Sequence, residues 1–311
     1  MTMSGDIRIS LTIASLGSNL PPFYLGYSEQ VFSETSGASR YTLDACAVSM
    51  LERSFVMIPG IGLGRERRLW ELGITDFDAF IDAEWLPGIS RNRLHDFHRG
   101  AEEARRRVRL GDVRWICKAL PKREIWRILA MRDKRIAALD IECARRGNTW
   151  TPVVVSVCLK GKECVTLIRG ENLYWDKLSR LLDETDILLT YNGSSYDLPV
   201  LARHGFRVDR CVHLDLARFS RMLGLTGGLK CLEKRIGITR PRELEYSTES
   251  QASYLWDLWE KKGNKRAIDL LVEYNRQDAE SLIPLADIMY RMLRANRLKG
   301  VEGHAETRGA G

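Results

Sequence analysis

The spacing of hydrophobic residues changes character along the chain. Between residues 51 and 109, apolar residues recur at helical spacing in short basic segments that are separated by glycine-containing turns. From residue 135 onward, β-branched runs typical of strands alternate with helical patterns. The pattern therefore predicts a small all-α domain followed by a larger α/β domain.

The α/β part is predicted to begin with three strands in succession and to end in helices. The expected strands are 135–142, 152–159, 163–168, 186–191 and 211–214, with turns at Gly147 and Gly161. The expected helices are 173–184, 198–204 and a helical stretch from 215 almost to 298. A meander followed by alternating helices and strands predicts a mixed sheet with helices packed on it.

The all-α part contains an internal repeat. Residues 58–62 read Ile-Pro-Gly-Ile-Gly, and residues 86–90, 28 positions later, read Leu-Pro-Gly-Ile-Ser. A basic amphipathic segment follows each of them, at 65–72 and at 91–97. The sequence thus predicts two similar units, each a turn that leads into a helix.

Charge is concentrated next to this repeat. The chain carries a formal net charge of +7, and residues 91–135 hold 15 Lys or Arg against 6 Asp or Glu. A basic block of this kind attracts a polyanion, and nucleic acid is the most abundant polyanion in a cell. A solvated basic helix without a partner is the alternative that charge alone leaves open.

Several classes of protein are disfavoured by composition. Seven cysteines without a C-x-x-C pair argue against a disulfide framework and a zinc site, and so favour a reducing compartment. No apolar run approaches the roughly 20 residues of a membrane-spanning helix. A phosphate-binding G-x-x-x-x-G-K-[ST] loop is missing, so no motor activity is expected. We expect a soluble cytoplasmic protein.

Carboxylates stand out at three places: the end of a predicted strand, the start of a predicted helix and the interior of a predicted helix. Asp140 and Glu142 end the first strand, and their spacing of two places both side chains on one face. Asp197 opens a helix after the fourth strand, where it could equally be an N-cap. Tyr274 and Asp278 are four residues apart in a helix and so share a face.

Together these motifs resemble the DEDD exonuclease superfamily in its tyrosine-containing branch, DEDDy, and most closely its YprB-like ribonuclease H-fold group. The resemblance covers residues 112–298. It implies that Asp140 and Glu142 form a first motif, Asp197 with Asn192 a second, and Tyr274 with Asp278 a third. It also implies a ribonuclease H-like mixed sheet flanked by helices.

The resemblance implies a two-metal mechanism at the four carboxylates. Hard oxygen ligands suit Mg²⁺ or Mn²⁺, and a pair of such ions can clamp a phosphodiester. Tyr274 is expected to orient the attacking water. Asp215 could add an outer carboxylate or cap a helix, and Lys230 could contact a phosphate or simply be exposed. Residues 143–146, Cys-Ala-Arg-Arg, depart from the family's small hydroxyl residues and glycine, which puts nucleotide preference in doubt.

The repeat resembles a tandem helix-hairpin-helix motif, which implies sequence-independent contact with a nucleic-acid backbone. Two ordinary helical turns, or a protein-binding role, are the alternatives. Five aromatic residues are expected to form the core of this part: Phe55, Trp70, Phe77, Phe80 and Trp85. The expected nucleic-acid-binding residues are Gly60, Ile61, Gly62, Arg65, Gly88, Arg91, Arg93 and Lys230.

These arguments predict four segments. They are an unassigned extension at 1–49, a helix-hairpin-helix DNA-binding module at 50–110, an exonuclease domain at 111–298 and a disordered tail at 299–311. The expected function is metal-dependent 3′-to-5′ exonuclease action on single-stranded 3′ ends, with DNA favoured over RNA. The alternatives are a ribonuclease or structure-specific nuclease with the same site, and a non-catalytic nucleic-acid-binding protein.

Overall fold

The computed structural model describes residues 49–238, 240, 249–299 and 301. The predicted N-terminal extension, 1–49, lies outside the described residues except for Ser49. The predicted tail, 299–311, lies outside them except for Lys299 and Val301. Within the described ranges, no helix is both long and apolar enough to cross a membrane.

A five-stranded mixed sheet forms the centre of the larger part, in the order β3-β2-β1-β4-β5. β1, β2 and β3 pair antiparallel, whereas β4 pairs parallel to β1 and β5 parallel to β4. The strands are β1 (Ile136–Arg146), β2 (Thr149–Leu159), β3 (Cys164–Ile168), β4 (Ile187–Thr190) and β5 (Val212–Asp215). This architecture confirms the predicted ribonuclease H-like mixed sheet.

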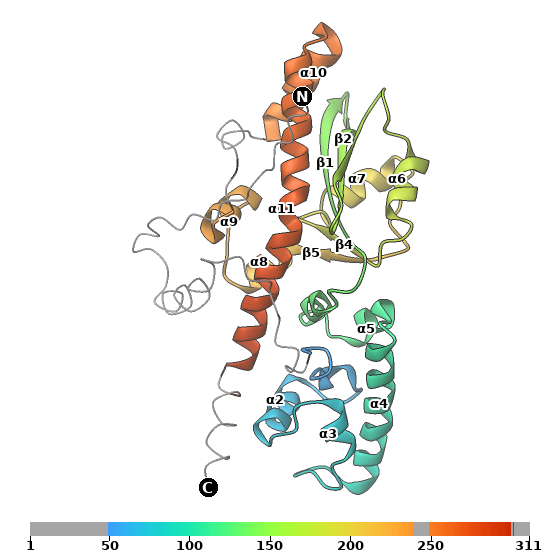
Figure 1. Cartoon of the computed structure of the whole chain (residues 1–311), viewed down its shortest axis with the longest axis vertical. Helices are drawn as coiled ribbons and strands as arrows, with labels where there is room; N and C mark the ends of the chain where they lie inside the picture. Colours follow the sequence, from blue (N-terminus) through green and yellow to red (C-terminus); the bar gives the residue numbers. More distant parts are fainter. Residues whose placement is uncertain (1–48, 239, 241–248, 300, 302–311) are drawn as a thin grey trace, which may run out of the picture.

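Helices cover both faces of the sheet, and Figure 1 shows α11 running along one of them. Leu139 and Ile141 of β1 pack with α6 and α7, whereas Ala138 joins the core under α8 and α11. The helices are α6 (Trp175–Leu182), α7 (Asp197–Arg203), α8 (Leu216–Met222), α9 (Leu229–Ile236), α10 (Glu249–Lys262) and α11 (Lys265–Leu298). Even-numbered positions of β1 up to Glu142 therefore face the α11 side.

The first two strands are longer than the sequence predicted. β1 runs on to Arg146 and β2 begins at Thr149, so residues 143–146 continue the strand. Cys143 and Ala144 are buried against α7 and α10, which explains why the strand does not end after Glu142. The register shifts directly after Glu142, and a bulge of this kind re-aims neighbouring side chains.

The smaller part is all helical, as predicted, and its two repeats share one backbone course. Gly60 and Gly88 both have positive φ, +89° and +73°, which favours glycine. In each repeat the residue after this glycine donates its N–H three residues back, Ile61 to Ile58 and Ile89 to Leu86. The helical elements that precede β1 are η1 (Phe55–Met57), α2 (Leu63–Glu71), α3 (Phe77–Ile81), α4 (Arg91–Arg109), α5 (Val113–Ala119) and η2 (Ile125–Ala130).

Ser90 in place of the last glycine of the repeat has a simple explanation. Gly62 and Ser90 are the N-caps of α2 and α4, and both adopt extended backbone with negative φ. Because no left-handed conformation is needed there, serine fits as well as glycine. The second repeat is therefore structurally equivalent to the first despite its weaker sequence match.

An ion network joins the two parts of the molecule, and all of its members except Arg297 are fully buried. Arg127 in η2 donates to both carboxylate oxygens of Glu66 in α2, at 2.8 and 2.7 Å, and to Glu124 at 2.8 Å. Glu124 also pairs with Arg297 near the end of α11. Arg127, Glu66 and Glu124 are essentially inaccessible to solvent. One apolar core extends across the same junction, from Met50 to Val301.

One expectation about side chains was wrong, and one cysteine pair was not predicted. Trp85 does not join the core of the helical part: its side chain is 72% exposed, whereas Phe55, Trp70, Phe77 and Phe80 are buried. The structure also contains a disulfide, Cys158–Cys164. These cysteines face each other across the β2–β3 pair, a juxtaposition that strand register creates and that cysteine spacing alone does not reveal.

Candidate active site

Three predicted carboxylates converge between β1 and α11. Asp140, Glu142 and Asp278 each offer an oxygen, and these oxygens lie within 4.8 Å of one another. Asp140 and Glu142 project from the same face of β1, as their spacing predicted, and α11 brings Asp278 to that face. Such a group of hard oxygen ligands can hold a divalent cation.

Asp197 lies beside this cluster. The side chain is buried, and Oδ1 accepts a hydrogen bond of 3.2 Å from the backbone N–H of Ile141. Asp197 is the first residue of α7, and the N-cap position before it belongs to Tyr196. The capping role that sequence left open therefore does not apply. The carboxylate instead fixes the backbone between Asp140 and Glu142.

Repulsion and burial dominate the electrostatics of the cluster. Burial raises the pKa of Asp140 well above its usual value, and the charges of Asp278, Asp197 and Glu142 raise it further. Burial likewise raises the pKa of Asp197, to about 7. Partly buried carboxylates this close to one another favour either protonation or a bound cation. The cluster should therefore bind either a proton or a metal cation.

Asn275 belongs to the site although sequence analysis did not select it. Its side chain is fully buried, and Nδ2 donates to Oδ2 of Asp140 at 2.6 Å. Asn275 lies three residues before Asp278 and so shares its helical face. A polar residue on the buried face of a long helix was the available signal. The contact orients the Asp140 carboxylate.

Tyr274 reaches the site, as its spacing from Asp278 predicted. The residue is 8% exposed, and burial followed by the charge of Asp278 raises the pKa of its hydroxyl. Because a phenol with a raised pKa stays protonated, Tyr274 can donate or accept a hydrogen bond but is a poor base near neutral pH.

Two cations from the α9 region approach the same carboxylates. Lys230 places its ammonium 4.1 Å from the centre of the Tyr274 ring, so it is not merely an exposed lysine. Arg240, which sequence analysis missed, forms an ion pair with Asp278 and is held by Glu233. Burial lowers the pKa of Lys230, although the charge of Asp278 opposes this shift.

Asp215 organises the loop before Asp197. It caps α8 by accepting from Ala217, as one sequence-based alternative proposed, and it also accepts from the backbone N–H groups of Asn192 and Ser194. Asn192 has a φ of +62°, and a side chain at Gly193 would collide with Thr190. The Asn192 side chain itself is exposed. Asp215 therefore stabilises the conformation of the loop that precedes Asp197.

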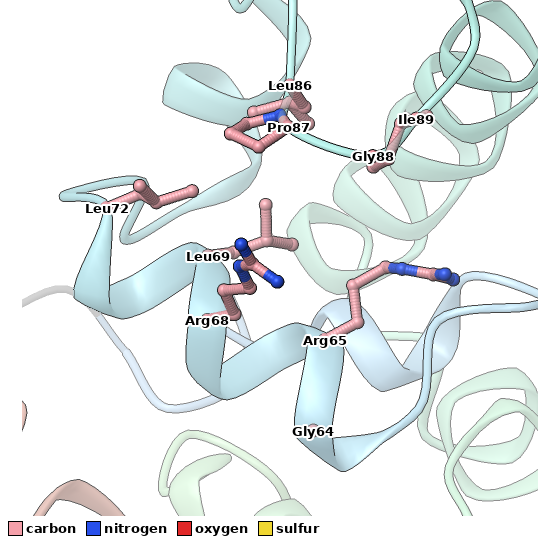
Figure 2. A pocket seen from close by; sticks show the side chains of 9 residues that line it. All are labelled: Gly64, Arg65, Arg68, Leu69, Leu72, Leu86, Pro87, Gly88 and Ile89. Carbon is pink, nitrogen blue, oxygen red and sulfur yellow. The ribbon is translucent and has the colours of Figure 1, made fainter.

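A cavity of about 300 Å³ lies between the two repeats, and two of the predicted backbone-binding residues, Arg65 and Gly88, line it. Figure 2 shows Arg65 and Arg68 of α2 facing the loop that contains Pro87 and Gly88. The remaining lining is largely apolar, and Arg65 also donates to the Gly60 carbonyl at 2.6 Å. The N–H of Ile61 is used within its own turn and its side chain is buried, so Ile61 is not a surface contact.

Arginines of α4 divide into two groups. Arg93 lies over the Phe97 ring, 5.5 Å from its centre, and Arg91 is exposed at the start of the helix. Farther along, Arg105 and Arg109 pair with Asp78, and Arg107 with Glu103. Within the described residues, neither Arg91 nor the exposed Arg68 of α2 forms an ion pair, so both guanidiniums are available at the surface.

Comparison with known proteins assigns a superfamily to most of the larger part. A family model for the RNase H superfamily matches residues 138–290, a range that includes the acidic cluster. These residues form an RNase H superfamily domain. No curated protein matches the chain. Among solved structures, the family B DNA polymerase from the hyperthermophilic archaeon Pyrobaculum calidifontis is similar at 16% identity and a TM-score of 0.42. The match covers 50% of this chain and 24% of the polymerase chain.

The residues of this RNase H superfamily domain fit a divalent metal. The ligand group consists only of carboxylates, which suit Mg²⁺ and Mn²⁺ better than softer ions. Mutual repulsion within the partly buried cluster would be relieved by a cation. Asp140, Glu142 and Asp278 are the residues that would hold it, with Asp197 alongside.

Proposed function

We propose that the protein is a metal-dependent 3′-to-5′ exonuclease that removes nucleotides from single-stranded 3′ ends, with DNA as the favoured substrate. The observation that carries the proposal is the meeting of Asp140, Glu142 and Asp278 with Tyr274 in an RNase H superfamily domain. The tyrosine and the order of the carboxylates along the chain support assignment to the DEDDy branch.

Each residue of the site has a task in this proposal. Bound divalent cations supply Lewis-acid polarisation of the phosphodiester and a water of lowered pKa. Asn275 keeps the Asp140 carboxylate directed into the site, and Asp197 fixes the strand that carries it. The protonated Tyr274 hydroxyl orients the attacking water, and Lys230 beside it faces the charge of the phosphate.

The helical part is proposed to grip the nucleic-acid backbone as a tandem helix-hairpin-helix module. Support comes from the equivalent turns at Gly60 and Gly88, and from the available Arg68 and Arg91 guanidiniums at the surface of the two repeats. The exposed ring of Trp85 directly precedes the second turn and offers a face on which a base could stack.

Incubation of the full chain with 5′-labelled single-stranded DNA or RNA tests the proposal. With Mn²⁺ or Mg²⁺ we expect a ladder that shortens from the 3′ end one nucleotide at a time, and with EDTA no cleavage. Faster loss of RNA would favour the ribonuclease alternative. Internal cuts would indicate a structure-specific nuclease, and tight binding without cleavage in either metal would contradict an exonuclease.

Changing both Arg68 and Arg91 to glutamine is expected to weaken DNA binding at every sequence. Each lost phosphate contact lowers the salt slope by about 1, so the double variant should lose about 2 from the slope of log K against log salt. Fluorescence anisotropy between 50 and 200 mM salt measures this slope.

The control for this variant is Arg180→Gln on α6, an exposed arginine paired with Asp176 outside the helical part. We expect it to leave the slope unchanged. An equal fall in the two proteins would mean that binding depends on overall charge, and an unchanged slope in the double variant would remove these arginines from the interface.

A further inference from the structure

Arg240 occupies an unusual position at the acidic cluster. Its side chain is 5% exposed, and one guanidinium edge is bound to Glu233 of α9, with Nε–Oε2 and Nη2–Oε1 distances of 2.5 and 2.6 Å. The remaining nitrogen, Nη1, pairs with Oδ1 of Asp278. One buried arginine thus links a residue that is not among the metal-ligand candidates to one that is.

The ion pair with Asp278 conflicts with metal binding at the same carboxylate. Asp278 is one of the three residues whose oxygens lie within 4.8 Å of one another. A metal ion bound by Asp278 would share this carboxylate with the guanidinium, and like charges repel strongly in buried surroundings. The positive charge of Arg240 also reduces the negative potential that attracts a divalent ion.

We propose that Arg240 is a built-in competitor for the metal site. In the metal-free protein it neutralises Asp278, and metal binding requires this ion pair to open. Glu233 is the positioning residue, because its bidentate contact keeps the guanidinium at the site after Asp278 has turned to the metal. The inference rests on the proposed metal-dependent function and adds to it a device that sets how much metal the enzyme needs.

The competition accounts for two features of the site. Glu233 is 1% exposed in a position where a buried carboxylate is costly unless it is paired, and Arg240 satisfies it. The clustered carboxylates also repel one another, so a resident cation holds them together before a metal arrives. Arg240 therefore stabilises the metal-free site and weakens its affinity for metal.

Direct Mn²⁺ binding tests the inference. The full chain is stripped with EDTA and dialysed, and free Mn²⁺ is counted by electron paramagnetic resonance during titration. Arg240→Gln is expected to lower the Mn²⁺ midpoint by about tenfold or more, since a repelling charge has been removed. Arg240→Lys, which keeps the charge but not the two-pronged contact, is expected to fall between this variant and the unchanged protein.

Arg235→Gln is the matched control, because it removes the same charge from an exposed position on α9, the helix that carries Glu233. The Mn²⁺ midpoint of this variant is expected to equal that of the unchanged protein. If Arg240 served only the fold, Arg240→Gln would lower the melting temperature and leave the midpoint unchanged, and that result would overturn the inference. If Arg240→Gln does not fold, a midpoint for Arg240→Lys at or above that of the unchanged protein would overturn it.

Failure of the proposed function gives a different result. An unchanged chain that binds no Mn²⁺, or one whose binding is unaffected by Asp140→Asn, would remove the metal site and both proposals with it. If the unchanged chain binds Mn²⁺ and degrades DNA, but the Mn²⁺ midpoint is the same in Arg240→Gln, only the proposed competition is overturned.

Discussion

Replacing Asp140 with asparagine is expected to reduce nuclease activity by at least about a thousandfold, which corresponds to about 4 kcal/mol of lost transition-state stabilisation. Asp140 lies at the centre of the cluster, close to Glu142 and Asp278, and Asn275 orients it. Asparagine keeps the size and one oxygen that can accept from Asn275, but it loses the charge that a divalent ion needs. Single-turnover digestion of labelled DNA in Mn²⁺ measures the loss.

The same variant is expected to leave the metal-free protein folded and no less stable. Burial and neighbouring charges raise the pKa of Asp140, so its ionised form costs stability in the folded state. A carboxyl whose pKa is raised by folding stabilises the protein at low pH, and that stability is lost as the pH rises through the raised value. Metal-free protein should therefore lose stability as the pH rises through the raised pKa of Asp140, and Asp140→Asn should flatten this dependence.

The matched control is Asp176→Asn on α6, a carboxylate whose side chain is 66% exposed and which is paired only at the surface. We expect normal activity and an unchanged pH dependence of stability. Activity of Asp140→Asn within about tenfold of the unchanged protein, a difference of about 1.4 kcal/mol, would contradict the assignment of the site.

The largest effect on stability is expected from Arg127→Met. The substitution leaves Glu66 and Glu124 as buried carboxylates with one less partner, and breaking a buried pair in this way costs about 3–5 kcal/mol. Urea unfolding followed by tryptophan fluorescence measures the change. A single transition is expected in the unchanged protein, because the ion network and the apolar core both cross the junction between the two parts.

Arg67→Met provides the comparison for this prediction. Arg67 lies on α2 one residue from Glu66, but it forms an exposed pair with Glu71, and such pairs contribute less than about 1 kcal/mol. Equal destabilisation by the two substitutions, or two separate unfolding transitions, would show that the helical part is stabilised independently. Since removal of residues 50–110 would uncover the shared core, point substitutions test the role of that part more cleanly than truncation does.

Much of the local structure could be predicted because short-range periodicity determines it. The alternation in β1 placed Asp140 and Glu142 on one face, and helical spacing placed Tyr274 and Asp278 together. The repeated Pro-Gly sequence predicted two equivalent turns, which Gly60 and Gly88 confirm. In each of these cases the residues that interact are close in sequence, so a pattern could show them.

Contacts between distant segments were decided only by the tertiary structure. Asn275 reaches Asp140 across 135 positions, and Arg127 reaches Glu66 across 61. Asn, Arg and Glu are common on helix surfaces. Only their burial distinguishes Asn275, Arg127 and Glu66 from exposed residues of the same types. Sequence thus determined the mixed sheet, the repeat and the faces that carry the carboxylates. Packing decided which polar side chains are excluded from water, because burial depends on elements that fold together from remote parts of the chain.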